Sequence, residues 1–180
     1  VLNRLVEDLL ILAKIDEGLE ILRRPFSLHA EIERTIRKKS KEITERNLTV
    51  YNEIEGPLEI NGDTVKLRHL FYHLLDNAVK FSHPNQSIHI WAQTSEEGNL
   101  QLVFADQGIG IAPEDQVKIF DRFFQLDASD SRNYGGLGIG LTIAQAIATA
   151  HGGQITVRSA PNAGSQFTLT LPAAEADWHV

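Results

Sequence analysis

Two clusters of glycine mark the part of the sequence best suited to binding a phosphate group. Six of the 13 glycines lie between residues 106 and 140. Because glycine has no side chain, backbone N–H groups in such loops can approach phosphate oxygens closely. The second cluster, residues 135–140, leads directly into a segment expected to be helical, and a helix N-terminus favours anions. A structural loop with tight turns is the alternative explanation of these glycines.

The surroundings of these glycines exclude two common phosphate motifs. The sequence contains no G-x-x-x-x-G-K-[ST] pattern, so the chain is not a P-loop protein. The glycines at 136–140 follow a polar loop rather than a strand, which is a poor match for a dinucleotide-binding fingerprint.

Three polar residues could complete a nucleotide site. Asp106 follows an alternating segment and precedes the first glycines. Its carboxylate could accept a hydrogen bond from an exocyclic amine such as adenine N6, or it could merely stabilise a turn. Asn77 lies on or near the apolar stripe of a helix, where its amide needs a partner; it is either a satisfied structural residue or an oxygen ligand for Mg²⁺. Lys80, one helical turn further on, could reach a phosphate.

The elements that must position these residues alternate between helices and strands. Apolar residues at steps of three and four predict helices over residues 1–17, 27–43, 64–81 and 139–150. Alternating apolar residues predict strands over 48–54, 58–60, 88–93, 100–104, 154–159 and 166–171. Ser27 and Asp63 are expected to cap the second and third helices, and Val65 to lie on the core face of the third. This pattern predicts a two-layer sandwich with helices on one face of a mostly antiparallel sheet.

The N-terminal part of the chain carries two further expectations. The leucine-rich stripe of residues 1–17 is too short to form a stable helix alone, so it needs a partner. Residues 19–25 are expected to form a linker, or a linker that becomes an edge strand. In the second helix, a run of charged residues is expected to form a solvated face. These residues are Arg34, Arg37, Lys38, Lys39, Lys41 and Glu42.

Length and composition limit the function further. A chain of 180 residues corresponds to one domain, or to one domain with a short appendage. The formal net charge of −7 argues against binding of nucleic acid or of anionic membranes as the main function. The absence of cysteine removes disulfides, thiolate metal sites and cysteine nucleophiles. Because the chain starts at Val1 inside an expected helix, it is expected to be a fragment of a longer protein.

Four motifs together resemble the catalytic domain of sensor histidine kinases, which belongs to the GHKL ATPase superfamily. In chain order they resemble the N box, the first glycine box, the F box and the second glycine box of that family. The matching residues are Asn77-Ala78-x-Lys80-Phe81, Asp106-x-Gly108-x-Gly110, Phe120-Asp121-Arg122-Phe123-Phe124 and Gly136-x-Gly138-x-Gly140-Leu141. Each motif is weak alone, but four in the family's order are specific.

The resemblance implies a role for individual residues. Asn77 would bind Mg²⁺, Asp106 would bind adenine N6, and Lys80 and Arg122 would contact phosphate. Residues 120–136 would form a flexible lid over ATP. The implied nucleotide contacts are Asn77, Lys80, Phe81, Asp106, Gly108, Gly110, Ile111, Gly136, Leu137, Gly138, Gly140 and Leu141, and the implied catalytic residues are Asn77, Lys80, His73 and Arg122.

The resemblance also implies an α+β fold of the Bergerat type and a division of the chain. Residues 1–18 would end the second helix of a dimerisation and histidine-phosphotransfer hairpin, and 19–26 would be a linker. Residues 27–172 would form the ATP-binding catalytic domain, and 173–180 a disordered tail. The implied reaction transfers the γ-phosphoryl group of ATP to a histidine of that hairpin. The implied partners are ATP or ADP, the hairpin, a response-regulator receiver domain and a second copy in the full-length protein. The domain would be cytoplasmic, and the full-length protein could be anchored in the inner membrane.

The sequence departs from the family pattern at three points. His73 replaces the usual second asparagine, at a position where hydrolytic members carry a glutamate base; a packed, satisfied histidine is the alternative to a catalytic one. Gln125 stands where many members have a cation. The phosphoacceptor motif is absent, and His29 lacks its context. Two alternative functions stay open, namely an ATPase or conformational clamp of the same superfamily and a non-catalytic regulatory module.

Overall fold

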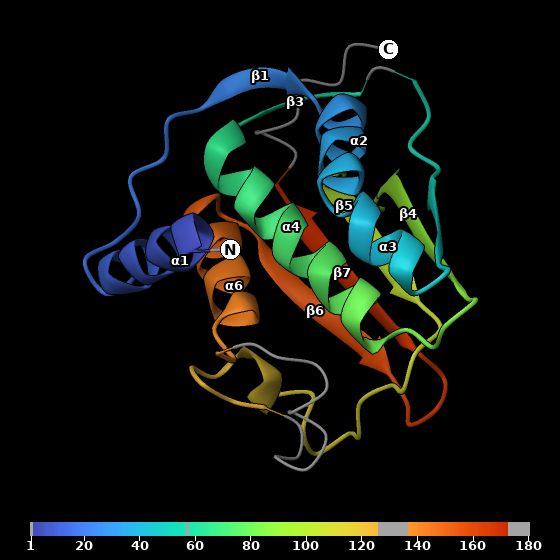
Figure 1. Cartoon of the computed structure of the whole chain (residues 1–180). Coiled ribbons are helices and arrows are strands. Elements are labelled where there is room, and N and C mark those ends of the chain that lie inside the picture. Colours follow the sequence, from blue (N-terminus) through green and yellow to red (C-terminus); the bar gives the residue numbers. More distant parts are fainter. Residues whose placement is uncertain (1, 57, 126–136, 173–180) are drawn as a thin grey trace.

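The computed structural model describes residues 2–56, 58–125 and 137–172, with side chains from residue 6 onward. Its main element is a five-stranded mixed sheet with the strand order β2-β4-β5-β7-β6. The strands are β2 (Thr49–Asn52), β4 (Ser87–Thr94), β5 (Leu100–Asp106), β6 (Gln154–Ser159) and β7 (Ser165–Leu171). Only the β2–β4 pair is parallel; the other pairs are antiparallel. Helices cover one face of this sheet (Figure 1).

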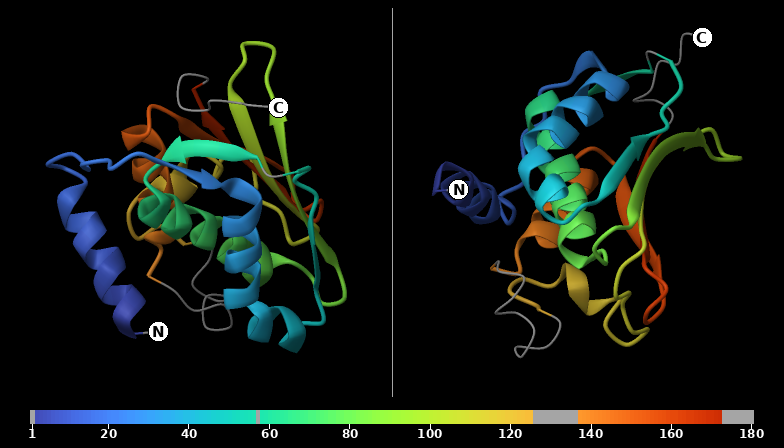
Figure 2. Two further views of the ribbon diagram at one scale, coloured as in Figure 1. Left: turned by 90° about the horizontal axis from the view of Figure 1, so that it is seen from above. Right: turned by 45° about the vertical axis from the view of Figure 1, so that its right-hand side comes forward.

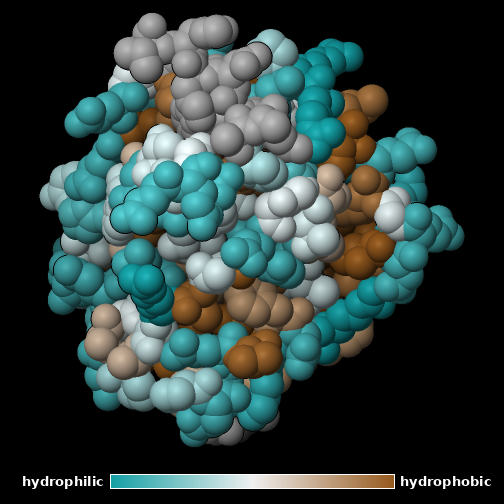
Figure 3. Space-filling model, turned by 180° about the vertical axis from the view of Figure 1, so that it is seen from behind, coloured by the Kyte–Doolittle hydropathy of each residue, from teal (hydrophilic) through white to brown (hydrophobic). Residues whose placement is uncertain are grey.

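The period of two in the strand sequences sets which side chains enter the core. Along β7, Phe167, Leu169 and Leu171 are buried, whereas the residues between them are partly exposed. Their register with β5 places Phe167 opposite Phe104 and Leu169 opposite Leu102, so that large apolar side chains lie side by side beneath the helices. The outer face of the sheet carries mostly hydrophilic side chains, with separate apolar groups (Figure 3). This is a two-layer sandwich, as predicted.

The helices of the covering layer are α2 (Leu28–Lys38), α4 (Thr64–Phe81) and α6 (Gly140–Ala150). The predicted caps are confirmed: Ser27 accepts a hydrogen bond from the backbone N–H of Ala30, and Asp63 accepts one from that of Lys66. Helix α4 is the central helix of the layer and contacts α2, α6 and β5. It therefore connects the core directly to the residues of the N box at its C-terminal end.

Helix α1 (Leu2–Lys14) lies beside this layer rather than within it (Figure 2). An extended segment joins it to β1 (Arg24–Ser27), which pairs with β3 (Glu59–Gly62) in a separate two-stranded antiparallel sheet. The last residues of the predicted linker are thus a strand, as one of the two interpretations of that segment expects. No helix in the described ranges is both long and apolar enough to cross a membrane.

Three expectations about the helices are wrong. The second helix is broken at Lys39 into α2 and a short α3 (Ser40–Glu45). Lys39, predicted on a solvated face, is only 4% exposed because its ammonium group pairs with the Asp76 carboxylate of α4. Val65, predicted in the core, is 62% exposed. In each case a tertiary contact, or its absence, overrides the local pattern.

Candidate nucleotide-binding site

The C-terminal end of α4 is bound to the first glycine loop. The Phe81 carbonyl accepts a hydrogen bond from the N–H of Ile109 at 3.1 Å, and Ser82 forms an isolated β-bridge with Gly108. A Cβ atom at Gly108 would collide with the Phe81 carbonyl. Glycine at this position therefore allows the N box and the first glycine box to approach each other closely.

Asp106 ends β5 at the same place and is 8% exposed. Its Oδ1 atom accepts hydrogen bonds from the N–H of Gly108 at 2.9 Å and of Ser165 at 3.2 Å. Burial raises the pKa of Asp106 to about 6, although these N–H donors and the charge of His83 oppose the shift. Both backbone donors bind Oδ1, which fixes the orientation of the carboxyl group.

The end of β6 and the loop that follows it, residues 159–160, contact the first glycine loop. The sequence analysis did not identify these contacts. Ser159 Oγ accepts a hydrogen bond from the N–H of Ile111 at 2.8 Å. A Cβ atom at Gly110, whose φ is +70°, would collide with the Ala160 carbonyl. The serines Ser159 and Ser165 carry no sequence signal of their own, because their contacts join segments far apart in the chain.

Asn77 and Lys80 lie on the last turns of α4, near Phe81. The Asn77 side chain is half-buried and makes no hydrogen bond with any described residue. A half-buried amide without a partner is free to bind a ligand. The Lys80 ammonium group forms an ion pair with Asp76 Oδ2 at 2.6 Å.

Asp76 connects Lys80 to a second, buried cation. Lys39 Nζ lies 2.7 Å from Asp76 Oδ1 and 2.8 Å from Glu42 Oε1, and it donates to the Tyr72 hydroxyl at 3.2 Å. Burial raises the pKa of Asp76, but the charge of Lys80 and the hydrogen bond from Lys39 outweigh it and hold the pKa below its usual value. Lys39 and Asp76 are residues that the sequence analysis did not assign to the site.

The second glycine cluster contacts the F box. The Gly138 carbonyl accepts a hydrogen bond from the N–H of Phe123 at 2.9 Å, and Thr142 Oγ1 donates to the Phe120 carbonyl at the end of a 3-10 turn, Lys118–Phe120. Leu141 packs against the core and Leu137 is 46% exposed. Gly136 and most of the predicted lid, residues 126–136, lie outside the described residues, as does the predicted tail, 173–180.

Two predicted catalytic residues are bound to the N-terminal segment instead of pointing freely into the site. His73 is buried, and its Nε2 atom lies 3.1 Å from Asp8 Oδ1 on α1. Arg122 makes two hydrogen bonds to the Asp16 carboxylate, at 2.6 and 3.3 Å. The structure thus joins the N box and Asp106 to the first glycine loop, and the second glycine loop to the F box, while His73 and Arg122 contact residues before the predicted domain.

This arrangement joins a buried carboxylate at a strand end, two glycine loops and a free amide on the central helix. A family profile described as histidine kinase-, DNA gyrase B- and HSP90-like ATPase matches residues 62–175. The chain belongs to this family. The matched range contains all four motifs, so ATP binding follows from the family as well as from the residues.

Individual relatives narrow the comparison to histidine kinases. The chain is 38% identical over 133 residues to the sensor-like histidine kinase SenX3 of Mycobacterium tuberculosis, covering 74% of this chain and 32% of SenX3. It is 34% identical over 179 residues to the circadian input-output histidine kinase CikA of Synechococcus elongatus, covering 95% of this chain and 23% of CikA. The crystal structure of full-length ShkA in complex with AMPPNP superposes with a TM-score of 0.82 at 26% identity, over 95% of this chain and 35% of ShkA.

The chain spans about a third or less of the length of the curated relatives it matches. It corresponds to the ATP-binding catalytic domain of a two-component histidine kinase, as predicted from the four motifs. The α+β fold with a mixed sheet and an N-terminal helix is confirmed by the same structural relative.

Proposed function

We propose that this domain transfers the γ-phosphoryl group of ATP to a histidine on the dimerisation hairpin of the full-length protein. The observation that carries this choice is the state of Asp76, the carboxylate next to Asn77. It is bound by Lys39 and Lys80, and its pKa is lowered, so it is a weak base for activating water. His73, the other candidate, is held by Asp8. An acceptor imidazole needs no such base, because it is itself the nucleophile.

In this proposal some residues of the site bind the adenine ring of ATP and others bind its phosphates. Asp106 would accept a hydrogen bond from the adenine amine, with Gly108, Gly110 and Ile111 lining the base pocket. Lys80 would contact a phosphate with another N–H of its ammonium group while it stays paired with Asp76, and the loop at Gly138 and Gly140 would approach the phosphates with backbone N–H groups. In the transfer step, a P–N bond to the acceptor forms, the P–O bond to the β-phosphate breaks, and ADP leaves.

Mg²⁺ is the metal that the donor set near the phosphates fits. Asn77 offers one free amide oxygen, and Mg²⁺ takes few protein ligands because it retains water and binds phosphate oxygens. When bound, the ion would offset the negative charge of the phosphates. Asn77 would hold it, and Lys80 would add a second positive charge on the same face of α4.

The partners of the longer protein follow from the same proposal. Helix α1 would be the end of the hairpin's second helix, and its exposed residues Val6, Leu9 and Leu10 would pack in a bundle with a second copy. A response-regulator receiver domain would take the phosphoryl group from the histidine. We place the domain in the cytoplasm, where ATP is available, with the full-length protein free to be anchored in the inner membrane.

The test combines binding and transfer. The chain is titrated with ATP in the presence and absence of Mg²⁺, and then incubated with γ-labelled ATP and the histidine-bearing hairpin of the full-length protein. We expect Mg²⁺-dependent binding and acid-labile, alkali-stable label on the hairpin only. Asn77→Ala should abolish transfer and the Mg²⁺ dependence but keep the fold, because the Asn77 side chain makes no hydrogen bond with the described residues.

Three results would contradict the proposal. Steady ATP hydrolysis by the chain alone, without transfer to the hairpin, would identify an ATPase or clamp. A failure to bind ATP would identify a regulatory module that has lost the nucleotide. Label retained on the chain itself would mean that one of its seven histidines is an acceptor.

A further inference from the structure

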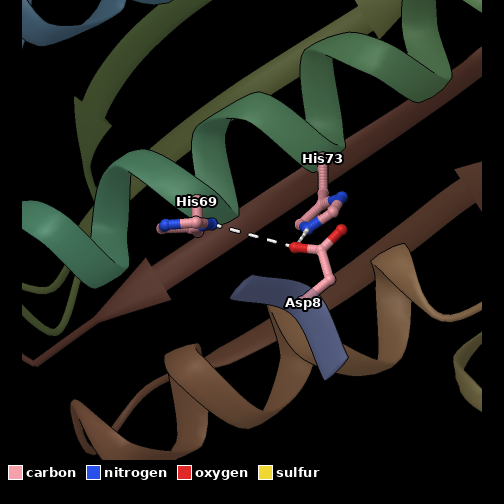
Figure 4. Close-up of side chains that lie close together, drawn as sticks. All are labelled: Asp8, His69 and His73. Atoms are coloured by element: carbon pink, nitrogen blue, oxygen red, sulfur yellow. Dashed lines mark hydrogen bonds and ion pairs between the residues drawn. The ribbon is translucent and has the colours of Figure 1, made fainter. Parts of the chain in front are cut away.

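A cluster of two histidines and an aspartate lies between α1 and α4. Helix α1 presents Asp8 to the domain: Asp8 is 7% exposed, whereas its neighbours Leu9 and Leu10 face solvent. His69 and His73 stand four residues apart on α4, so their side chains leave the same face of the helix one turn apart. Both imidazole rings point toward the Asp8 carboxylate (Figure 4).

The three side chains offer their ligand atoms to one small volume. Asp8 Oδ1 lies 3.1 Å from His73 Nε2 and 3.8 Å from His69 Nδ1. One ligand atom from each of the three residues lies within 4.8 Å of the others. Around a tetrahedral Zn²⁺ with bonds of about 2.0–2.2 Å, ligand atoms are on the order of 3.3 Å apart. Small side-chain rotations would therefore bring the three atoms to bonding distance.

The donor set and its charge suit a borderline-soft divalent cation. Two imidazole nitrogens and one carboxylate oxygen, with a fourth position open to water, are a common zinc coordination. Asp8 is only 7% exposed and lies between the two helices, where a carboxylate needs polar or cationic partners.

The surroundings orient both rings. The Glu7 carboxylate lies 3.6 Å from His69 Nε2, the nitrogen that faces away from Asp8. A carboxylate beside the outer nitrogen of a histidine favours the tautomer whose inner nitrogen is free to bind metal. On the other side, the His73 ring lies against the start of α6, where a Cβ atom at Gly140 would come within 2.8 Å of Nδ1. His73 Nε2 is thus directed toward Asp8.

We propose that Asp8, His69 and His73 form a site for a zinc-like divalent metal that ties α1 to α4. This site is distinct from Asn77, whose single amide oxygen suits the harder Mg²⁺. A bound metal would hold α1 against the domain next to Gly140, where the second glycine loop ends and α6 begins. The proposal does not depend on the proposed transferase activity, because the site uses no residue of the ATP contacts.

The test measures zinc binding directly on the whole chain. A competition titration against a chromogenic chelator, with millimolar Mg²⁺ present throughout, should give one Zn²⁺ per chain. Co²⁺ in place of Zn²⁺ should give the visible absorption bands of a tetrahedral site. Amide exchange of residues 6–14 should slow when zinc is added, because the metal joins their helix to α4.

Variants identify the ligands. Asp8→Asn and His69→Gln should each lower the zinc affinity at least about 100-fold, and Glu7→Gln about 10-fold because it acts only through His69. The matched control is His89→Gln on β4, which removes a histidine paired with a carboxylate, Glu53 at 2.8 Å, outside the cluster. Its zinc affinity should be unchanged, and circular dichroism checks that each variant folds.

Several outcomes would overturn the proposal. One is the absence of stoichiometric zinc binding to the unaltered chain. Another is an affinity that His69→Gln and Asp8→Asn leave unchanged, which would mean that the metal binds elsewhere. Displacement of Zn²⁺ by millimolar Mg²⁺ would show a site of oxygen ligands rather than this one.

Discussion

The guanidinium group of Arg122 is held by the carboxylate of Asp16, at 2.6 Å between Nη2 and Oδ1 and 3.3 Å between Nη1 and Oδ2. Asp16 follows helix α1, while Arg122 belongs to the F box, 106 residues later. The residue expected to contact phosphate is therefore paired with the segment that leads out of the domain. Nucleotide and Asp16 would compete for the same cation.

Releasing Arg122 should strengthen nucleotide binding. The pair is exposed, so Asp16→Asn should change the free energy of unfolding by less than about 1 kcal/mol. If Arg122 contacts a phosphate, the same change should tighten ATP binding by about threefold, because Arg122 no longer has to break its ion pair with Asp16 when ATP binds. Isothermal titration of ATP measures this effect. Glu45→Gln, which removes another exposed carboxylate paired with Lys41, is the control; an equal gain there would indicate a general charge effect.

Acid should weaken the recognition of adenine. The pKa of Asp106 is about 6, so below this pH the carboxyl group is protonated and presents a donor to the donor amine of adenine. We expect the ratio of ATP to ITP affinity to fall as the pH drops from 8 through about 6. Both nucleotides carry the same triphosphate, so the effect of phosphate ionisation on affinity cancels in the ratio. ITP carries an oxygen in place of the amine.

Asp106→Asn provides the second half of that experiment. The variant has no titrating group at this position, so its ATP-to-ITP ratio should be low and independent of pH. A preference for ATP that survives in this variant, or a ratio that stays constant in the unaltered chain, would remove Asp106 from base recognition.

The buried Lys39–Asp76 pair should matter for stability. Lys39→Met leaves the buried carboxylate with Lys80 as its remaining charged partner, and we expect a loss of about 2–3 kcal/mol in the free energy of unfolding, measured with urea. The loss should be smaller than for a fully unpaired charge because Lys80 stays close. Lys41→Met, at an exposed position in the next helix, is the control and should change little.

A double variant tests whether the effects of Lys39 and Asp76 on stability are coupled. Replacing both groups by apolar side chains, Lys39→Met with Asp76→Leu, should recover much of the loss, since no unpaired charge remains. If the double variant is as unstable as the sum of both single variants, the two groups are not coupled.

We expect that no other residue can replace Gly110, because of its close approach to the Ala160 carbonyl as well as its positive φ. Gly110 and Gly18 both have positive φ, +70° and +90°, but a Cβ atom would meet the Ala160 carbonyl at Gly110 and nothing within 4 Å at Gly18. Gly18→Ala should therefore cost roughly 1–2 kcal/mol for the left-handed conformation alone. Gly110→Ala should cost more and abolish ATP binding, because the loop after Asp106 must move. Equal melting temperatures for the two variants would mean that the close contact is unimportant.

Local signals in the sequence predict most of the fold. Ser27 and Asp63 cap helices at the residues expected, and the alternation in β7 places Phe167 and Leu169 in the core. Such features depend on neighbours within a few residues, which a single sequence contains. The four motifs predict the nucleotide site for the same reason.

The contacts that the sequence analysis missed join distant segments. Lys39 looks like one more solvated charge until Asp76, 37 residues away, is brought to it. The hydrogen-bond partner of His73, Asp8, comes from α1, 65 residues earlier. Ser165 contributes only its backbone N–H to Asp106, and a backbone donor leaves no trace in residue type. These features follow from tertiary structure, which local patterns do not specify.

The hydrogen bond from Ser165 to Asp106 also sets the order in which the site can form. It spans 59 residues and joins β5 to β7, which follows all four motifs in the chain. A growing chain that has released the four motifs but not β7 still lacks one of the two backbone donors that orient the Asp106 carboxylate. If this carboxylate binds adenine, ATP would bind best during synthesis to chains in which β7 has already joined the sheet.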